Sequence, residues 1–114
     1  MLLLFLVSAT IVSAQPNFTA LQLNPAYPAQ NSGVEFVYNQ SLSSLIRKEP
    51  LKVVVYLIGK EIKAEEPTLK HYGSNYKGWV QTDSTTNAIA FVFYVGDEKD
   101  LNGGKGYIVP LYNN

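Results

Sequence analysis

The chain has 114 residues, of which 46% are hydrophobic, 12% aromatic and 16% charged. This composition suits one compact domain and is too rich in Tyr, Phe and Val for intrinsic disorder. The 9 basic and 9 acidic side chains give a net charge of zero. With no overall field to attract polyanions, we predict that nucleic acid is not a partner.

An apolar run, MLLLFLVSATIVSA, occupies residues 1–14. Small residues at Val12 and Ala14 are typical of an export signal cleaved after Ala14, so we predict a signal peptide over residues 1–14 and one exported module over residues 15–114. The run is shorter than the ~20 residues of a membrane-spanning helix, so we expect no membrane insertion after cleavage. No Lys or Arg precedes the run, and a buried N-terminal strand or an uncleaved anchor is the alternative.

The chain contains no cysteine. Small exported domains often rely on disulfides, but the ~100 residues left after processing are enough to form a core without them. Stability must therefore come from packing. Thiol redox chemistry, thiolate metal sites and cysteine nucleophiles are excluded within this segment.

Short segments with strand-like alternation recur along the rest of the chain and are separated by turn residues. The strongest is residues 51–58, where both faces are largely apolar, so we predict a central strand there. Pro110 indicates that the last strand lies at or near a sheet edge. The predicted strands span residues 18–23, 34–38, 51–58, 61–64, 67–72, 76–81, 89–95 and 107–112.

Six to eight short strands without a convincing amphipathic helix predict an all-β fold. The favoured architecture is an antiparallel β-sandwich of the immunoglobulin-like or fibronectin type III-like class. A short barrel is compatible with the same number of strands.

Few residues in the chain are suited to catalysis. His71 is the only histidine, and neither Glu65-Glu66 nor Asp83 stands at a spacing that would make it a catalytic partner or a co-ligand. Acid–base and metal sites both need several converging groups. We therefore predict that the chain is not an enzyme, with no catalytic residues, no metal site and no cofactor.

The loop at residues 97–103 has the acidic and glycine content of a calcium loop, but the match fails in detail. Counting from Asp97 puts Lys99 at a ligand position, and counting from Asp100 leaves too few acids downstream. The sequence therefore favours a hairpin turn in which Asn and Gly supply positive φ angles.

Aromatic side chains are the main candidates for a binding surface. Tyr72, Tyr76 and Trp79 lie close in sequence and could stack on sugar rings or meet a partner protein. The alternative is that Tyr and Trp pack at sheet faces as ordinary strand residues. A further set could share one sheet face: Tyr56, Tyr94, Tyr107 and Tyr112.

Several segments stand in a distinctive order: strands at 34–38 and 51–58, Lys77-Gly78-Trp79, the run IAFVF at 89–93, and the ending LNGGKGYIVPLY at 101–112. In this order they resemble the immunoglobulin-like N-terminal region of exported thioredoxin-like proteins, the thiol-disulfide oxidoreductase-associated proteins of Bacteroidetes. In that group the region precedes helical and thioredoxin-fold portions. The likeness covers about residues 21–112, and the asparagine- and glycine-rich loop before a Gly-Tyr strand is its most specific part.

The resemblance implies an accessory role, because the redox motif of that group is a Cys-x-x-Cys pair and this chain has no cysteine. We expect a non-catalytic interaction or spacer module in the periplasm or elsewhere in the cell envelope or outside the cell. Its partners would be another protein or the neighbouring domains of a longer parent chain. The chain is also similar to immunoglobulin-like starch-binding modules, which favours the alternative of a carbohydrate-binding module with Tyr72, Tyr76 and Trp79 as its platform.

Overall fold

The computed structural model describes residues 18–112, and the regular structure in this range is β-strand apart from two short 3-10 helices. The helices are η1 (Gln40–Leu42) and η2 (Asn102–Gly104). The strands are β1 (Leu21–Asn24), β2 (Gly33–Asn39), β3 (Lys52–Ile58), β4 (Ile62–Glu65), β5 (Lys70–Tyr72), β6 (Asn75–Gln81), β7 (Ala88–Val95), β8 (Glu98–Lys99) and β9 (Tyr107–Pro110).

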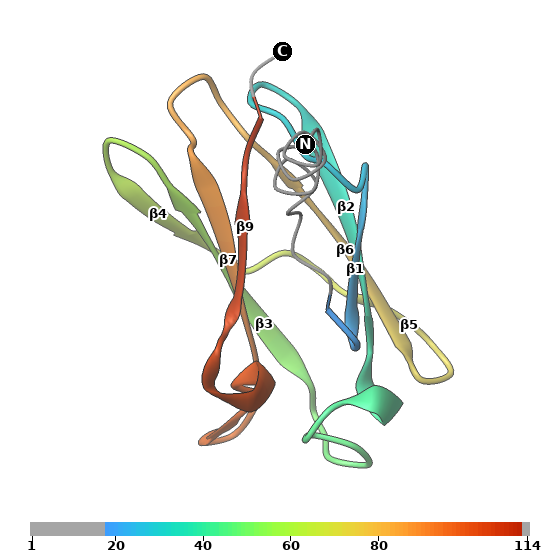
Figure 1. Ribbon diagram of the computed structural model, residues 1–114. Helices are drawn as coiled ribbons and strands as arrows, with labels where there is room; N and C mark the ends of the chain where they lie inside the picture. Colours follow the sequence, from blue (N-terminus) through green and yellow to red (C-terminus); the bar gives the residue numbers. More distant parts are fainter. Residues whose placement is uncertain (1–17, 113–114) are drawn as a thin grey trace, which may run out of the picture.

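The strands form two antiparallel sheets (Figure 1). One has the order β1-β2-β6-β5, and the other has the order β4-β3-β7, with β8 and β9 both paired to β7. This is the arrangement of an immunoglobulin constant-type domain, with β4 added beside β3. Within residues 18–112 no strand ladder joins the two sheets, so they do not close into a barrel. The predicted all-β antiparallel sandwich is confirmed.

The core lies between the sheets and is built by strict alternation. Val34, Phe36 and Tyr38 of β2 point inward from one sheet and are fully buried. They meet the inward side chains of β7, and the ring of Phe93 stacks on that of Tyr38 at a centroid distance of 3.7 Å. Burying each such side chain stabilises the fold by about 1.5–3 kcal/mol.

Glycine makes room for the largest of these contacts. Gly78 of β6 stands opposite Phe36 of β2. A Cβ at position 78 would lie only 2.4 Å from Cζ of Phe36, so the phenyl ring occupies the space that a side chain would need. Phe36 then reaches the second sheet, where its ring packs edge-on against Phe91 at 5.0 Å.

Both predictions about strand position are confirmed. The predicted central strand is β3, which lies between β4 and β7. The strand that contains Pro110 is β9, which pairs with β7 alone among the described strands. An edge position tolerates proline because no neighbour needs its missing N–H.

The structure has nine strands within residues 18–112, one more than the upper predicted number. The additional strand is β8, which follows a two-residue turn at Gly96-Asp97. Gly96 has φ +58°, a conformation that glycine adopts without steric cost. This tight turn lets Glu98 and Lys99 pair with the end of β7 before the chain leaves the sheet, whereas the sequence predicted a single loop.

The predicted signal peptide at residues 1–14 lies outside the described residues. Between residues 18 and 112, no helix has the length and apolar character needed to cross a membrane.

Candidate functional site

The three aromatic residues predicted to form a platform lie on β5 and β6 but not on one face. Tyr76 points inward and is 8% exposed, whereas Trp79 points outward and is 56% exposed. Tyr72 pairs with Asn75 and so shares the outer face with Trp79, with 57% of its surface exposed. The structure therefore brings Tyr72 and Trp79 to one face and places Tyr76 on the other.

Tyr76 is a packed residue. The ring of His71 stacks on it at a centroid distance of 4.1 Å and an interplanar angle of 10°. Burial, together with the charge of Glu49, raises the pKa of the Tyr76 hydroxyl. Its ring is thus covered on the side where a ligand would have to stack.

The exposed rings of Tyr72 and Trp79 are separated by a basic stretch. Asn75, opposite Tyr72, and Trp79 are four residues apart on β6, or ~13 Å at a rise of ~3.3 Å per residue. Lys70 and Lys77 lie between them as a directly opposed cross-strand pair on the same face. The two rings can therefore contact one extended ligand but not one sugar ring.

A shallow hollow of about 210 Å³ adjoins the indole, lined by Glu35, Thr68, Lys70, Lys77, Gly78 and Trp79. Lys77 forms an ion pair with Glu35 of β2, with 3.5 Å between Nζ and Oε2. The indole itself lies against Gly33, where a Cβ would be 2.7 Å from both Nε1 and Cζ2 of the ring. The missing side chain of Gly33 thus lets Trp79 settle on the backbone of β2.

The lysines, Glu35 and Thr68 were missed by the sequence analysis. Strand alternation could have placed Lys77 and Trp79 on one face of β6, since they are two residues apart. Nothing in the sequence, however, indicated that β5 would bring Lys70 opposite Lys77, because that depends on the register of a three-residue strand.

The second sheet presents a very different outer surface. We call it the apolar face and define it by the outward side chains of β4, β3, β7 and β9 other than Lys52, which begins β3 at the edge of the face: Ile62, Ala64, Val54, Tyr56, Ile58, Ala88, Ala90, Val92, Tyr94, Ile108 and Pro110. Ile62 and Ile108 are 67% and 54% exposed, and the outward residues of β3 and β7 are half-buried by their neighbours. No member of this set carries a charge.

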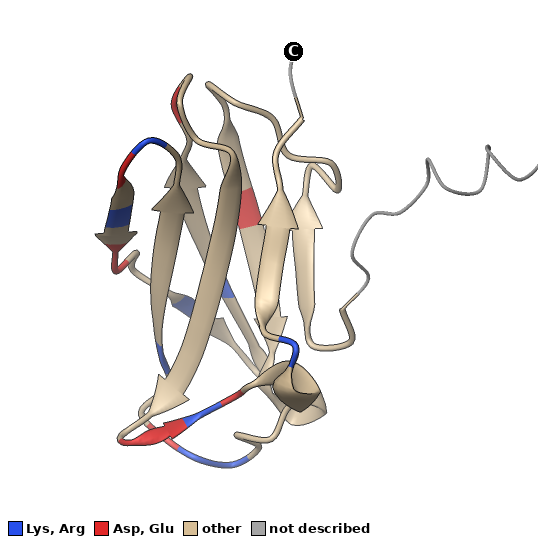
Figure 2. Ribbon diagram, turned by 60° about the vertical axis from the view of Figure 1, so that its left-hand side comes forward, with Lys and Arg blue, Asp and Glu red and all other residues tan. Residues whose placement is uncertain are grey.

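Charged residues border the apolar face rather than interrupt it. Lys52 and Lys99 both pair with Tyr94 and stand at one end of it. In Figure 2, β3, β7 and β9 carry almost no charged residues along their length, while charges gather on the β4 hairpin and at β8. An antiparallel sheet usually has one packed face and one polar face. This sheet departs from that rule, because both of its faces are apolar.

The predicted sharing of one face by four tyrosines is only half right. Tyr56 and Tyr94 belong to the apolar face. Tyr107 begins β9 with its side chain inward and is 3% exposed. Tyr112 lies beyond β9, where its ring contacts that of Tyr27 at 5.5 Å.

Asp100 is the one buried charged side chain within residues 18–112. The hydroxyls of Tyr38 and Tyr107 donate to its Oδ2 at 2.6 and 2.5 Å, and the N–H of Asn102 donates to its Oδ1 at 2.9 Å. Burial, followed by the bond to Asp100, raises the pKa of both tyrosine hydroxyls. The carboxylate therefore links the two sheets through one tyrosine of each. The sequence predicted only a hairpin turn at this position and gave no indication of the link.

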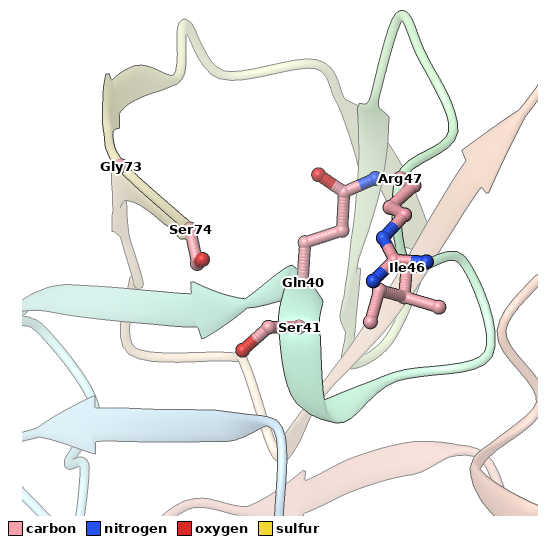
Figure 3. Close-up of a pocket in the computed structure, with 6 residues that line it drawn as sticks. All are labelled: Gln40, Ser41, Ile46, Arg47, Gly73 and Ser74. Carbon is pink, nitrogen blue, oxygen red and sulfur yellow. The ribbon is translucent and has the colours of Figure 1, made fainter.

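A third surface feature is a hollow of about 320 Å³ between the η1 loop and the β5–β6 turn (Figure 3). Its wall includes Gln40, whose Nε2 donates to the carbonyls of Leu45 and Lys48 and so holds the loop closed. Arg47 is the single charged residue of the lining. No carboxylate or imidazole is among the residues that line this hollow, so the lining itself contains no acid–base pair.

The remaining titratable candidates lie apart from one another. His71 is exposed on β5, with Nε2 2.6 Å from the carbonyl oxygen of Gly73, while Glu65 is on β4 in the other sheet. Asp83 bonds to Lys63 and to its own turn, and these hydrogen bonds hold the pKa of its carboxyl below the usual range. Between residues 18 and 112 no three His, Asp or Glu side chains gather into a potential metal site.

Comparison of the chain with protein-family models, with curated proteins and with solved structures gave no match. Its fold class is that of an immunoglobulin-like β-sandwich, with two outer faces of different character.

Proposed function

We propose that this chain is a non-catalytic interaction module whose apolar face packs against another protein domain. The observation that carries the proposal is the continuous run of uncharged, mostly aliphatic side chains across β4, β3, β7 and β9. The largest contiguous exposed apolar patch of a soluble protein, about 300–600 Å² in area, is often a functional surface. Covering such a surface is favourable by about 25 cal/mol per Å².

The size of the apolar face supports this role. Its two central strands, β3 and β7, have seven and eight residues, and β4 and β9 beside them have four each. At a spacing of ~4.8 Å between strands and a rise of ~3.3 Å per residue, the face covers roughly 300 Å². A standard interface buries about 800 Å² on each partner, with an apolar core inside a polar rim. The apolar face thus has the dimensions of an interface core, and Lys52 and Lys99 stand where its rim would be.

The resemblance to exported thioredoxin-like proteins suggests the identity of the partner. We propose that the apolar face packs on a helical or thioredoxin-fold portion of the same polypeptide, in a protein exported to the cell envelope. A permanent contact within one chain suits such a surface, because obligate interfaces are the more hydrophobic ones. The two rim lysines favour acidic side chains on the partner.

Site-specific photo-crosslinking tests the proposal. A photoreactive amino acid replaces Val92 on the apolar face, in the full protein expressed in its own host. The matched control replaces Val37, an outward valine of β2. It lies on the other sheet, where it pairs with Lys77 of β6. We expect a light-dependent crosslink from position 92 to a domain of the same polypeptide, identified by mass spectrometry, and none from position 37.

Two results would contradict it. Absence of a crosslink at position 92, or equal crosslinking at both positions, would overturn the docking role of the apolar face. A crosslink from position 92 to a second copy or to an unrelated protein would overturn the assignment of the partner to the same polypeptide.

A further inference from the structure

We propose that the outer face of the other sheet binds an acidic sugar chain along β6, between Trp79 and Asn75. This surface belongs to β2, β5 and β6 and lies on the opposite side of the sandwich from the apolar face. The inference is therefore independent of the proposed docking function, and each can fail without the other.

The charge of the ligand follows from two lysines. Lys70 and Lys77 are directly opposite each other, which places their Cβ atoms ~5 Å apart. Like charges in this position destabilise a strand pair. Glu35 neutralises only Lys77, and within residues 18–112 Lys70 forms no ion pair. A ligand carboxylate between the two ammonium groups would relieve this repulsion.

The sugar character of the ligand follows from what surrounds the lysines. Trp79 offers an exposed indole for the apolar side of a sugar ring, and Thr68 and Glu35 supply a hydroxyl and a carboxylate for its hydroxyl groups. The hollow of about 210 Å³ is smaller than the roughly 300–1,000 Å³ of clefts that enclose a drug-sized ligand. It therefore suits one ring of an open chain rather than an enclosed substrate.

A second hollow continues the surface in the direction of Asn75. It measures about 220 Å³ and is lined by Thr19, Ala20, Gln22, Val37, Asn39, Leu42 and Asn75. Lys77, which lines the first hollow, is the direct cross-strand partner of Val37, which lines the second, so the two hollows adjoin. Amide and hydroxyl groups predominate among its polar atoms, and they can donate to and accept from sugar hydroxyls. An oligosaccharide can therefore pass from Trp79 over the lysine pair to Asn75, where Tyr72 stands opposite.

Trp79 is the only tryptophan in the sequence, so its fluorescence reports directly on this site. The probes are a short oligogalacturonate and its methyl-esterified form, in which a methyl group replaces the negative charge of each carboxylate. We expect a saturable change in emission with the acid form, weakening as salt is added, and no saturable change with the ester.

Variants separate the contributions of charge and length. Lys70→Gln and Lys77→Gln should each weaken binding of the oligogalacturonate by roughly two- to fivefold, the range of an exposed ion pair. Lys60→Gln, in the β3–β4 hairpin, is the matched control and should leave the affinity unchanged. Asn75→Ala should weaken binding of the oligomer but not of galacturonic acid itself, because a single ring reaches only the first hollow.

Equal binding of the acid and the ester would overturn the assignment to an acidic ligand. An unchanged emission spectrum with both probes, in a protein whose unfolding is normal, would overturn the site. Full affinity in the Lys70→Gln/Lys77→Gln double variant would do the same.

Discussion

The two outer faces of this domain contrast sharply although the sheets behind them share one core. On the sheet β1-β2-β6-β5, outward positions carry polar and charged groups such as Glu35, Asn75 and Lys77, with Trp79 among them. On the sheet β4-β3-β7-β9, the corresponding positions are valine, isoleucine, alanine and tyrosine, apart from Lys52 at one end and Pro110 on the edge strand. Inward residues are alike in both sheets because the core demands apolar side chains from each.

This difference shows where function is encoded in a small sandwich. The inward residues decide that the sheets pack, and the outward residues decide what each sheet meets. A polar face is stable in water and binds through a few placed groups, whereas an apolar face gains free energy only when it is covered. Substitutions can measure how firmly the two faces are held together and how separately each responds.

The largest expected effect comes from Asp100, whose hydrogen bonds to two tyrosines link the two sheets. Asp100→Ala leaves the hydroxyls of Tyr38 and Tyr107 buried without their acceptor. We expect the free energy of unfolding to fall by about 3 kcal/mol, measured by denaturant titration. Asp97→Ala, in the exposed turn before β8, is the control and should change it by less than about 0.5 kcal/mol. A loss at Asp100 no larger than that of the control would mean that the tyrosine hydroxyls have other partners.

A smaller loss of stability is expected when a glycine of the sheet β1-β2-β6-β5 is replaced by alanine, either on the core side of the sheet or on its outer side. Gly78→Ala forces a Cβ against Phe36 in the core and should cost about 2 kcal/mol in the free energy of unfolding. Gly33→Ala forces a Cβ against Trp79 on the outside, where the indole can move into solvent, and should cost less than about 1 kcal/mol while shifting the tryptophan emission. The reverse order of the two losses would contradict the placement of the core.

The smallest effect concerns the turn between β6 and β7. The hydrogen bond from Lys63, followed by those from Thr85 and Thr86, lowers the pKa of Asp83 below its usual value of 3.8. Below that pH the unfolded chain takes up a proton that the folded turn resists, so stability is present above about pH 4 and is lost as the pH falls. Asp83→Asn should abolish this part of the acid dependence, as followed by thermal unfolding between pH 5 and pH 2.

Lys63→Gln provides the matched comparison for that turn. Since the hydrogen bond from Lys63 is the largest cause of the lowered pKa, this variant should reduce the acid dependence without removing it. Identical pH profiles for the wild type and Asp83→Asn would show that other carboxyl groups control acid unfolding.

The fold class could be predicted from local pattern, but the candidate site could not. Alternating apolar residues identified the core strands, and the apolar character of both sides of residues 51–58 identified β3 as central. Closeness in sequence suggested that Tyr76 and Trp79 act together. They stand three positions apart on a strand, however, and an odd separation puts two side chains on opposite faces.

The sequence by itself determined eight of the nine strands within residues 18–112 and the alternation that turns every second side chain toward the core, because both follow from a period of two and the burial of apolar groups. Only the tertiary structure decided that Lys70 meets Lys77, that Asp100 lies between Tyr38 and Tyr107, and that four strands join their apolar sides into one surface. These contacts depend on strand order and register, which arise from pairings between residues far apart in the chain.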